Sequence, residues 1–411
     1  MAKKRILCPY CFRHFDNIDA EYQCENLEMN ASRTEELCSS EEDMRYNQHW
    51  GYVGAVTKHF FKGKKPLLAM TYTPKPAKCD KCGMPSTRFV CPHCHNWLPT
   101  EMIEEGSEII SIIGAPSSGK TVYFLSLIHE LKRVGYKLGL TVRAKDEAPD
   151  KNMRTSVIYN RLSSELFDEH RLPEQTHVSE RQCPLIFKLI SSKNPGTVSK
   201  EDKSIYLVFY DTAGEAFKSA DDIDRMAKHL MESSGIILLV DPFSIKKLRN
   251  RMDAAGIPLP ESSSISVFDA LANLMEAVGA DKKFMNKYMA VTFSKFDAVE
   301  EGLEACGEEP IVDLTRNSTF LKSGIYTPAD TDAIHGKMKI FAEDLCDMGQ
   351  LVHDVGTKFN GEKGNYRLFA ISSLGYRPKD NTVSEIDPYR VMDPLVWILY
   401  KMGGFHIPVK K

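Results

Sequence analysis

Apolar residues follow two alternating patterns from about residue 108 to the end of the chain. Short β-branched runs at 108–113, 184–190, 204–210, 235–240, 288–293 and 366–371 have the length and composition of buried strands. Between them, apolar positions recur at helical spacing over 122–131, 157–167, 267–278, 334–345 and 394–402, with Thr331 as the expected cap of the fourth helix. The pattern predicts an α/β fold, with helices on both faces of a mostly parallel sheet. A hairpin at Pro195-Gly196 is its expected antiparallel exception.

Cysteines, rather than apolar periodicity, organise the first hundred residues. C-x-x-C pairs recur among the eleven cysteines, and in a reducing compartment such pairs are typical of metal ligands rather than of disulfides. Four thiolates close in sequence form a compact set for tetrahedral Zn²⁺: Cys79, Cys82, Cys91 and Cys94. A second set is Cys8, Cys11, Cys24 and Cys38, with His14, His49 or His95 as an alternative to one of them. An interleaved grouping of the C-x-x-C pairs stays open, as do buried free cysteines and a redox pair.

The two regions predict two domains, a zinc-ribbon module over residues 1–104 and an α/β domain over 105–411. The segment Pro99–Gly106, which carries three glutamates, is the expected linker between them. Within the module, Lys58–Lys81 is rich in lysine and aromatic residues, a mixture that suits nucleic acid. Because the module as a whole is close to neutral, we favour a solvated face over a nucleic-acid site.

Charge and hydropathy give no sign of a membrane span or a signal peptide. A formal net charge of −3 argues neither for nor against a nucleic-acid partner, and the apolar runs fall short of a membrane span. The apolar run after the N-terminal basic residues is too short for a signal peptide. We therefore expect a cytoplasmic protein without membrane contact.

A glycine loop stands between the first strand and the first helix of the α/β region. The sequence Gly114-Ala115-Pro116-Ser117-Ser118-Gly119-Lys120-Thr121 fits G-x-x-x-x-G-K-[ST], the phosphate-binding loop. Its glycines let the backbone approach a polyphosphate, and N–H groups of the loop and of the helix start through Val122 point at it. Lys120 would reach the β- and γ-phosphates, and the Thr121 hydroxyl would bind Mg²⁺. The loop predicts a bound nucleoside triphosphate with Mg²⁺.

Three further polar loops follow later strands of the predicted sheet. They are Asp211-Thr212-Ala213-Gly214-Glu215, Ser294-Lys295-Phe296-Asp297 and Ser372-Ser373-Leu374. Ligands bind at the carboxyl ends of strands in open α/β sheets, where all three loops are expected to lie. Each loop alone is a weak signal, because aspartate, serine and glycine are common turn residues.

In this order, the loops resemble the translation-factor-related (TRAFAC) class of P-loop GTPases over residues 107–411. The resemblance implies GTP or GDP as ligand. It places Asp211 with Thr121 around Mg²⁺, Thr176 as the switch-one threonine on the same ion, and the Gly214 N–H on the γ-phosphate. It assigns guanine recognition to a base-binding set: Ser294, Lys295, Asp297, Ser372, Ser373 and Leu374. Glu215 departs from the class, since many relatives carry a water-orienting glutamine there. Glu215 is then either a general base or a side chain that points away.

The N-terminal module carries a second resemblance. The segments CPYCF, CPHCHNWLP and IIGAPSSGKTVY are similar to bacterial double-GTPase proteins of predicted conflict and anti-phage systems. Together the two resemblances imply a switch that binds GTP and hydrolyses it slowly, with Lys120, Thr121, Thr176, Asp211, Gly214 and Glu215 in the catalytic set. The zinc module would engage a partner protein, encoded nearby, or nucleic acid. The alternatives are a nucleotide-dependent scaffold without useful hydrolysis and, less favoured because of Asp297, an ATPase.

Overall fold

The computed structural model describes residues 4–26, 38–63, 75–114, 117–173, 183–193, 202–210, 228–229, 231–256, 259, 282–308, 317–379 and 381–410. The chain forms two compact units. The first, here called the cysteine unit, consists of Met1–Ile109 and Lys145–Val157. The second, the sheet unit, consists of Ile110–Ala144 and Ile158–Lys411. The cysteine unit therefore extends a few residues beyond the predicted module and includes a segment from within the predicted α/β domain.

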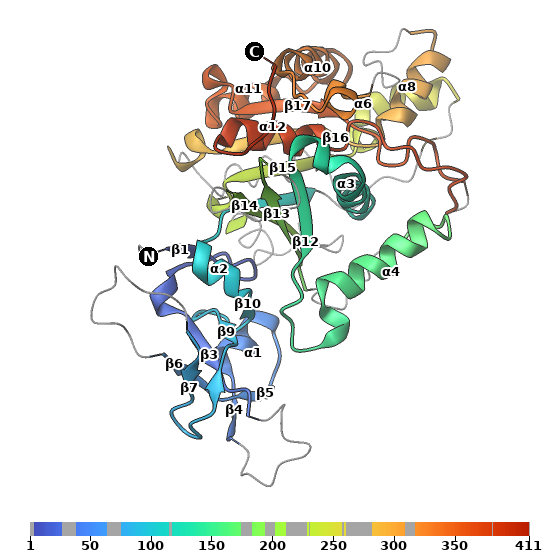
Figure 1. Cartoon of the computed structure of the whole chain (residues 1–411). Helices are drawn as coiled ribbons and strands as arrows, with labels where there is room; N and C mark the ends of the chain where they lie inside the picture. The colour runs from blue at the N-terminus through green and yellow to red at the C-terminus, as the bar shows by residue number, and fades with distance from the viewer. Residues whose placement is uncertain are drawn as a thin grey trace. The chain divides into compact units, whose positions relative to one another are not determined.

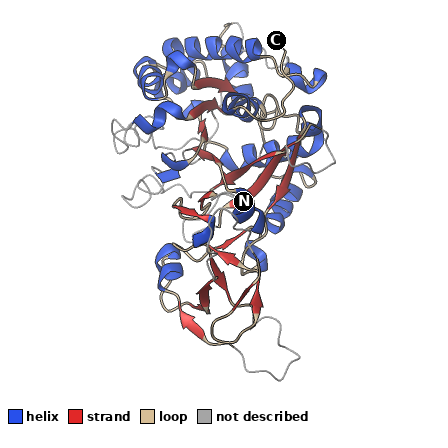
Figure 2. Ribbon diagram, turned by 60° about the vertical axis from the view of Figure 1, so that its left-hand side comes forward, coloured by secondary structure: helices blue, strands red, loops and turns tan. Residues whose placement is uncertain are grey.

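Short antiparallel strands build the cysteine unit (Figure 2). A four-stranded sheet has the order β10 (Trp97–Leu98), β9 (Phe89–Val90), β3 (Glu21–Gln23) and β6 (Phe60–Lys62). Three two-stranded sheets pair β1 (Arg5–Leu7) with β2 (His14–Asp16), β4 (Ser40–Glu42) with β5 (Val56–Lys58), and β7 (Ala77–Lys78) with β8 (Pro85–Ser86). Its core includes an aromatic group, in which Tyr22 stacks on Phe61 at a ring-centroid distance of 5.6 Å and lies tilted against Phe89 at 4.7 Å.

Two helices complete the cysteine unit. Helix α1 (Met44–Trp50) begins at Asp43, whose carboxylate accepts the Arg45 and Tyr46 N–H groups, as expected of an N-cap. Helix α2 (Thr100–Glu105) occupies the predicted linker, so that expectation is wrong. The physical reason is burial, since Met102 and Ile103 are fully buried and tie the segment to the core of the unit.

A seven-stranded sheet organises the other unit (Figure 1). Its order is β12 (Leu140–Ala144), β13 (Leu185–Ser191), β14 (Lys203–Phe209), β11 (Ile109–Gly114), β15 (Gly235–Val240), β16 (Tyr288–Phe293) and β17 (Tyr366–Ala370). Strands β11, β15, β16 and β17 pair in parallel, so their carboxyl ends share one edge of the sheet. The predicted hairpin strands β13 and β14 are antiparallel, and β12 adds a second antiparallel pair that the sequence did not indicate.

Helices cover both faces of this sheet, as the alternation of apolar strands and helices predicted. One core contains Ile236 and Leu238 of β15 with α6 (Lys246–Ala254), α8 (Phe296–Ala305), α10 (Pro328–Ile340), the π-helical turn Phe341–Leu345 and α11 (Gly349–Lys358). The opposite core contains Ile237 and Leu239 with α3 (Lys120–Val134), α4 (Thr155–Phe167), α9 (Thr319–Ser323) and α12 (Asp393–Met402). Successive residues of β15 therefore point to opposite cores.

Helix α10 begins earlier than the sequence indicated. Thr331 does not cap α10, which begins four residues earlier, with Thr327 at the N-cap and Pro328 in its first turn. Proline lacks an N–H and suits this position, so it sets the start of the helix. The predicted helix over 267–278 lies outside the described residues. None of the helices in the described ranges is long and apolar enough to cross a membrane.

Candidate functional site

The glycine loop joins the end of β11 to the start of α3, as predicted. A Cβ at Gly114 would lie 2.7 Å from both the Leu239 carbonyl oxygen and Ser118 Oγ, so only glycine fits there. Gly119 has a φ of 78°, and Ser117 has a φ of 57°. Left-handed residues next to a helix start turn successive N–H groups toward one point, which is the geometry of an anion-binding nest.

Two polar side chains of this loop, those of Ser118 and Lys120, are buried. Ser118 is fully buried, and its Oγ has no hydrogen-bond partner among the described residues. Lys120, the first residue of α3, is only 5 % exposed. Helix α3 follows Gly119 directly, so the positive end of its dipole adjoins the loop. The arrangement suits a polyanion at the helix start.

The loop after β16 is hydrogen-bonded to the glycine loop. The Ser294 hydroxyl donates to the Ser118 carbonyl oxygen at 2.8 Å and approaches the Val240 carbonyl oxygen at 3.2 Å. Next in the chain, Lys295 has a left-handed φ of 52°, and its ammonium contacts the Asp241 carboxylate at 2.9 Å. Residues 54 to 176 positions apart in sequence therefore meet at the carboxyl edge of the sheet.

The loop after β17 lies beside Asp297. The half-buried Asp297 carboxylate forms a hydrogen bond with the Ser372 side chain. Burial raises the pKa of Asp297 above its usual value, and the Ser372 hydrogen bond opposes that rise. Ser372 Oγ also accepts the Gly375 N–H at 2.8 Å, which orients its proton toward the carboxylate. The Ser372 hydroxyl thus holds the Asp297 carboxylate, which favours donor partners.

Helix α3 supports the same loop from the other side. The Ser126 hydroxyl of α3 donates to the Ser373 carbonyl oxygen at 2.8 Å. Ser372 also forms a β-bridge with Tyr389, with N···O distances of 3.2 and 2.8 Å. Leu374 packs against the core that contains α3. The loop is therefore fixed to the helix that follows the glycine loop.

Several predicted site residues lie outside the described residues: Ala115, Pro116, Thr176, Asp211, Gly214 and Glu215. Their roles stay predictions. The described members of the set, Gly114, Ser117, Ser118, Gly119, Lys120, Thr121, Val122, Ser294, Lys295, Asp297, Ser372, Ser373 and Leu374, all lie at the carboxyl ends of β11, β16 and β17. Asp241 at the end of β15 joins them and was missed, although an aspartate directly after a buried strand was visible in the sequence.

The cysteines form two clusters in the interleaved grouping. One cluster is Cys8, Cys11, Cys91 and Cys94, and the other is Cys24, Cys38, Cys79 and Cys82. The sequential grouping is therefore wrong. Its premise was that C-x-x-C pairs close in sequence share a site, but the fold instead brings the first pair against the third.

Each C-x-x-C pair adopts the same turn. The N–H of the first cysteine bonds to the carbonyl five residues later, which belongs to Arg13, Met84 or Asn96. The residue after the second cysteine has a left-handed φ in each case, 51° at Phe12, 74° at Gly83 and 54° at His95. Backbone N–H groups of Tyr10 and His93 also point at the Cys8 and Cys91 sulfurs, at 3.5 and 3.4 Å. Such N–H contacts stabilise a thiolate.

The sulfur positions fit a tetrahedral metal ion. Sγ–Sγ distances are 3.8 Å for Cys8–Cys94 and Cys11–Cys91. In the other cluster they are 3.5 Å for Cys24–Cys82 and 3.8 Å for Cys38–Cys79. Tetrahedral Zn²⁺ with Zn–S bonds of about 2.3 Å requires sulfurs roughly 3.8 Å apart, whereas a disulfide requires about 2 Å. Burial raises the pKa of Cys8 and Cys94, so a buried thiolate set there needs a cation. Both donor sets fit zinc.

The histidines proposed as alternative ligands are not in these two clusters. His95 is held instead by two buried carboxylates, with Nδ1 2.9 Å from Asp43 and Nε2 3.2 Å from Glu21. Burial lowers the pKa of His95, but the hydrogen bonds and charges of Asp43 and Glu21 outweigh it and raise the pKa above the usual value. This ion pair links β3, α1 and the third C-x-x-C turn.

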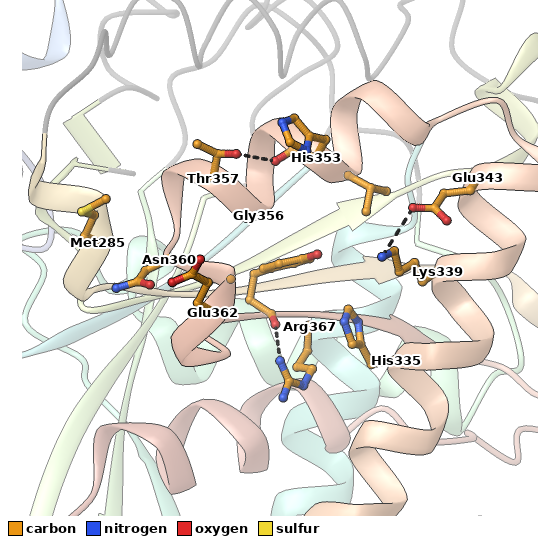
Figure 3. A pocket seen from close by; sticks show the side chains of 13 residues that line it. Met285, His335, Lys339, Glu343, His353, Gly356, Thr357, Asn360, Glu362 and Arg367 are labelled. Atoms are coloured by element: carbon orange, nitrogen blue, oxygen red, sulfur yellow. Dashed lines mark hydrogen bonds and ion pairs between the residues drawn. The ribbon is translucent and has the colours of Figure 1, made fainter.

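A pocket of about 510 Å³ lies elsewhere in the sheet unit, at the amino end of β17 and between α10 and α11 (Figure 3). Three of its charged side chains, those of Arg367, Lys339 and Glu343, are paired with protein groups. Arg367 bonds to Asp332 at 2.9 Å and to the Tyr366 carbonyl oxygen, and Lys339 lies 3.7 Å from Glu343. His335 Nδ1 accepts the Leu368 N–H at 3.1 Å. None of the residues that line the pocket belongs to the glycine loop.

The sheet order and the loops at its carboxyl edge define an α/β fold with a mostly parallel sheet, with β11 and its glycine loop at the centre and two four-cysteine clusters in the other unit. No family model matches the chain. The chain is 24 % identical over 325 residues, 76 % of its length and 80 % of the relative's, to a Mycolicibacterium smegmatis protein named "Putative ESX-1 scaffolding and assembly protein SaeC".

Two solved structures are also similar. The signal recognition particle receptor SRb-GTP/SRX complex of Chaetomium thermophilum matches with a TM-score of 0.27 and 13 % identity, over 67 % of this chain and 94 % of that chain. The Ski7 GTPase-like domain of S. cerevisiae, bound to GTP, matches with a TM-score of 0.28 and 8 % identity, over 72 % and 50 %.

Proposed function

We propose that this protein is a GTP-binding switch that hydrolyses GTP slowly and whose zinc-holding cysteine unit engages a partner. The observation that carries the proposal is the bond from Ser294 Oγ to the Ser118 carbonyl oxygen. It joins the loop that carries Lys295 and Asp297 to the glycine loop, so groups suited to a base and groups suited to phosphates belong to one site.

Phosphate binding is assigned to the glycine loop. Lys120 at the helix start meets the β- and γ-phosphates, and the loop N–H groups receive the remaining phosphate oxygens. Thr121, with Thr176 and Asp211, would hold Mg²⁺, which supplies charge neutralisation on the phosphates. The Gly214 N–H is assigned to the γ-phosphate, and Glu215 to the position of the attacking water. A carboxylate near the γ-phosphate is repelled, so hydrolysis by the isolated chain is slow, on the order of 10⁻⁴ to 10⁻² s⁻¹.

Guanine recognition is assigned to Asp297. Guanine presents two donors, N1–H and N2–H₂, on one edge, and a carboxylate presents two acceptors at matching spacing. The Ser372 hydrogen bond orients the carboxylate. Ser373 and Leu374 would complete the wall, with the Ser373 N–H toward the base oxygen. A site built on buried polar partners can reject adenine by roughly 10⁴-fold.

The test is a titration of the purified full chain with fluorescent GDP, competed by GTP, ATP and xanthosine triphosphate in the presence of Mg²⁺. Tight binding of GDP and GTP, with ATP weaker by orders of magnitude, supports the proposal. Equal affinity for ATP and GTP would end the guanine assignment. Lys120→Ala is the matched loss-of-binding variant, because it removes the phosphate-binding ammonium and leaves the base-binding loops unchanged.

A second candidate is a nucleotide-dependent scaffold without useful hydrolysis. The name of the M. smegmatis relative favours this function, because it calls that protein a scaffolding and assembly protein. Turnover separates the two functions. A chain that binds GTP but shows no hydrolysis above background, with and without the products of neighbouring genes, fits the scaffold. Slow hydrolysis that a partner accelerates fits the switch.

The proposal also concerns the biological process and the class of partner. A role in anti-phage defence rests on the resemblance of the cysteine segments and the glycine loop, and a nucleic-acid partner rests on the lysine-rich segment Lys58–Lys81. Of these lysines, Lys62 and Lys81 are paired with Glu21 and Glu41, which favours a protein partner. Phage challenge of cells carrying wild-type protein or Lys120→Ala tests the first. A gel-shift assay with the wild-type chain tests the second.

A further inference from the structure

Asp241 is a buried charged group that the assigned roles leave unused. It follows β15 directly and is fully buried. Both of its carboxylate oxygens have partners. Oδ1 accepts the Phe243 N–H at 3.0 Å, and Oδ2 accepts the Lys295 ammonium at 2.9 Å. Its backbone is held too, because the Ser244 hydroxyl donates to the Asp241 carbonyl oxygen at 2.6 Å.

This contact fixes a side chain that would otherwise be mobile. The Lys295 stem has four rotatable bonds, and its side chain is only 27 % exposed. Because Lys295 has a φ of 52°, its stem starts from a left-handed backbone next to Asp297. At the other end, the ammonium is bound to Asp241. The methylenes of Lys295 therefore lie between two fixed points, its own backbone and the Asp241 carboxylate.

A buried carboxylate alone would not hold its charge. Burial raises the pKa of Asp241 above its usual value, and the charge and hydrogen bond of Lys295 oppose that rise. Removing one partner from such a pair leaves the other charge uncompensated. The charges of the two residues therefore stabilise each other, and a substitution of Asp241 directly removes the partner of the Lys295 ammonium.

We propose that Asp241 is a positioning residue for nucleotide binding, which holds the Lys295 stem against the face of the bound base. The inference rests on the proposed function and deepens it by separating two kinds of base contact. Asp297 accepts hydrogen bonds from the edge of the base and determines which base is bound. Asp241 acts through Lys295 on the ring face, so it sets how tightly any accepted purine binds and does not contribute to the choice.

The test compares Asp241→Asn, Lys295→Met and the double variant in the full chain. Asparagine keeps an oxygen for the Phe243 N–H, so the turn after β15 is retained, and methionine keeps an apolar stem without the charge. Affinities are measured for GDP, for inosine diphosphate and for inorganic tripolyphosphate, which has no base. Thermal unfolding of each variant is recorded alongside.

Asp241→Asn is expected to weaken GDP and inosine diphosphate by the same factor, about tenfold, the value of one charge-assisted contact. Tripolyphosphate affinity should stay unchanged. In the Lys295→Met background, Asp241→Asn should have no further effect on any ligand, because its route of action is already lost. The thermal unfolding of every variant serves as the control for folding.

Three results would overturn the inference while leaving the proposed function intact. They are wild-type affinity for GDP in Asp241→Asn, an equal loss for GDP and tripolyphosphate, and additive effects of Asp241→Asn and Lys295→Met. Failure of the wild-type chain to bind GDP is a separate outcome. It would contradict the proposed function, and the inference would fall with it.

Discussion

Asp297 is the residue on which base specificity depends. Replacing it with asparagine exchanges two acceptors for one acceptor and one donor, a pattern that suits the 2-carbonyl of xanthine rather than the 2-amino group of guanine. Asp297→Asn should therefore weaken GTP and improve xanthosine triphosphate, by roughly 10²-fold or more in relative affinity, as expected when a buried polar group loses its partner. Competition titration against fluorescent GDP measures both changes.

The control is the thermal unfolding of the same variant. The Ser372 side chain can bond to an amide as well as to a carboxylate, so the midpoint should change little. Retained preference for GTP over xanthosine triphosphate in a well-folded Asp297→Asn protein would remove Asp297 from the base site.

For single residues, the sequence predicted their place in the fold where they belong to a short local motif. The glycine loop lies where its pattern required, and Gly114 and Gly119 are glycines for identifiable steric and conformational reasons. Asp241 could not be assigned a partner in this way. Its ion pair with Lys295 spans 54 positions and exists only because β15 and β16 are neighbours in the sheet.

Among the elements, the C-x-x-C turns determine the metal sites. Wild-type protein is expected to contain two zinc ions per chain, and Cys8→Ser, Cys91→Ser and the double variant should each contain one, because both residues belong to one cluster. The sequential grouping predicts instead that the double variant loses both ions. Zinc content per chain, measured by mass spectrometry of the purified protein, distinguishes the two.

A matched double variant sharpens this test. Cys8→Ser combined with Cys79→Ser affects both clusters and should leave no zinc, since thiolate sites contribute on the order of 10 kcal/mol to a small fold and rarely tolerate loss of a ligand. One zinc in this variant, or none in the wild-type protein, would contradict the assignment.

The pairing of the cysteine turns shows what sequence spacing leaves out. The first and third pairs share the form C-P-x-C, at Cys8-Pro9 and Cys91-Pro92, and these two join in one cluster. Distance along the chain favoured the wrong partners, whereas this shared form was the better signal. Similarly, β15 and β16 were predicted with their observed bounds because both are continuous apolar runs. Helix α2 was missed because its burial depends on contacts with residues remote in sequence.

Strand β17 carries a pH-sensitive contact at its edge. Burial, with a smaller effect of Arg367, lowers the pKa of His335 to about 4, and neutral Nδ1 accepts the Leu368 N–H. An unfolded histidine binds its proton near pH 6.5, so the unfolded state binds more protons than the folded state between pH 6.5 and 4. Stability should therefore fall as the pH falls through this window.

The comparison is between wild type and His335→Gln, whose amide oxygen can accept the same N–H without titrating. Chemical unfolding at pH 7 and at pH 4.5 should show a larger loss for wild type than for the variant. Equal losses in the two proteins would show that His335 titrates normally in the folded state.

On the scale of the whole molecule, the chain passes between its two units three times, after Ile109, Ala144 and Val157. The segment Lys145–Val157 belongs to the cysteine unit. Lys145 pairs with Glu101 at 2.7 Å, and the Tyr10 hydroxyl donates to the Glu147 carbonyl oxygen at 3.1 Å. Ala148 and Thr155 are buried. This connectivity was not predictable from composition, because the segment reads as a polar loop of the α/β region.

Deleting residues 1–106 should therefore harm the remaining chain. Segment 145–157 would lose the partners that bury it, so the shortened protein should unfold at a temperature several degrees lower, or aggregate, as expected for loss of a few kcal/mol. Differential scanning fluorimetry of the two proteins measures this. Full-length Tyr10→Phe is the mild control. A shortened protein as stable as the full chain would show that the segment needs no partner.

The two cysteine clusters are nested along the sequence, because all four residues of one cluster, Cys24 to Cys82, lie between the two halves of the other, Cys8 to Cys94. Nesting imposes an order in time on a chain made from its N-terminus. All ligands of the inner cluster have left the ribosome once Cys82 emerges, while Cys91 and Cys94 of the outer cluster are still inside it. Closing the inner loop first also shortens the free chain that the outer cluster must close, which lowers its entropic cost. The order of the cysteines thus favours metal binding at the inner cluster before the outer one.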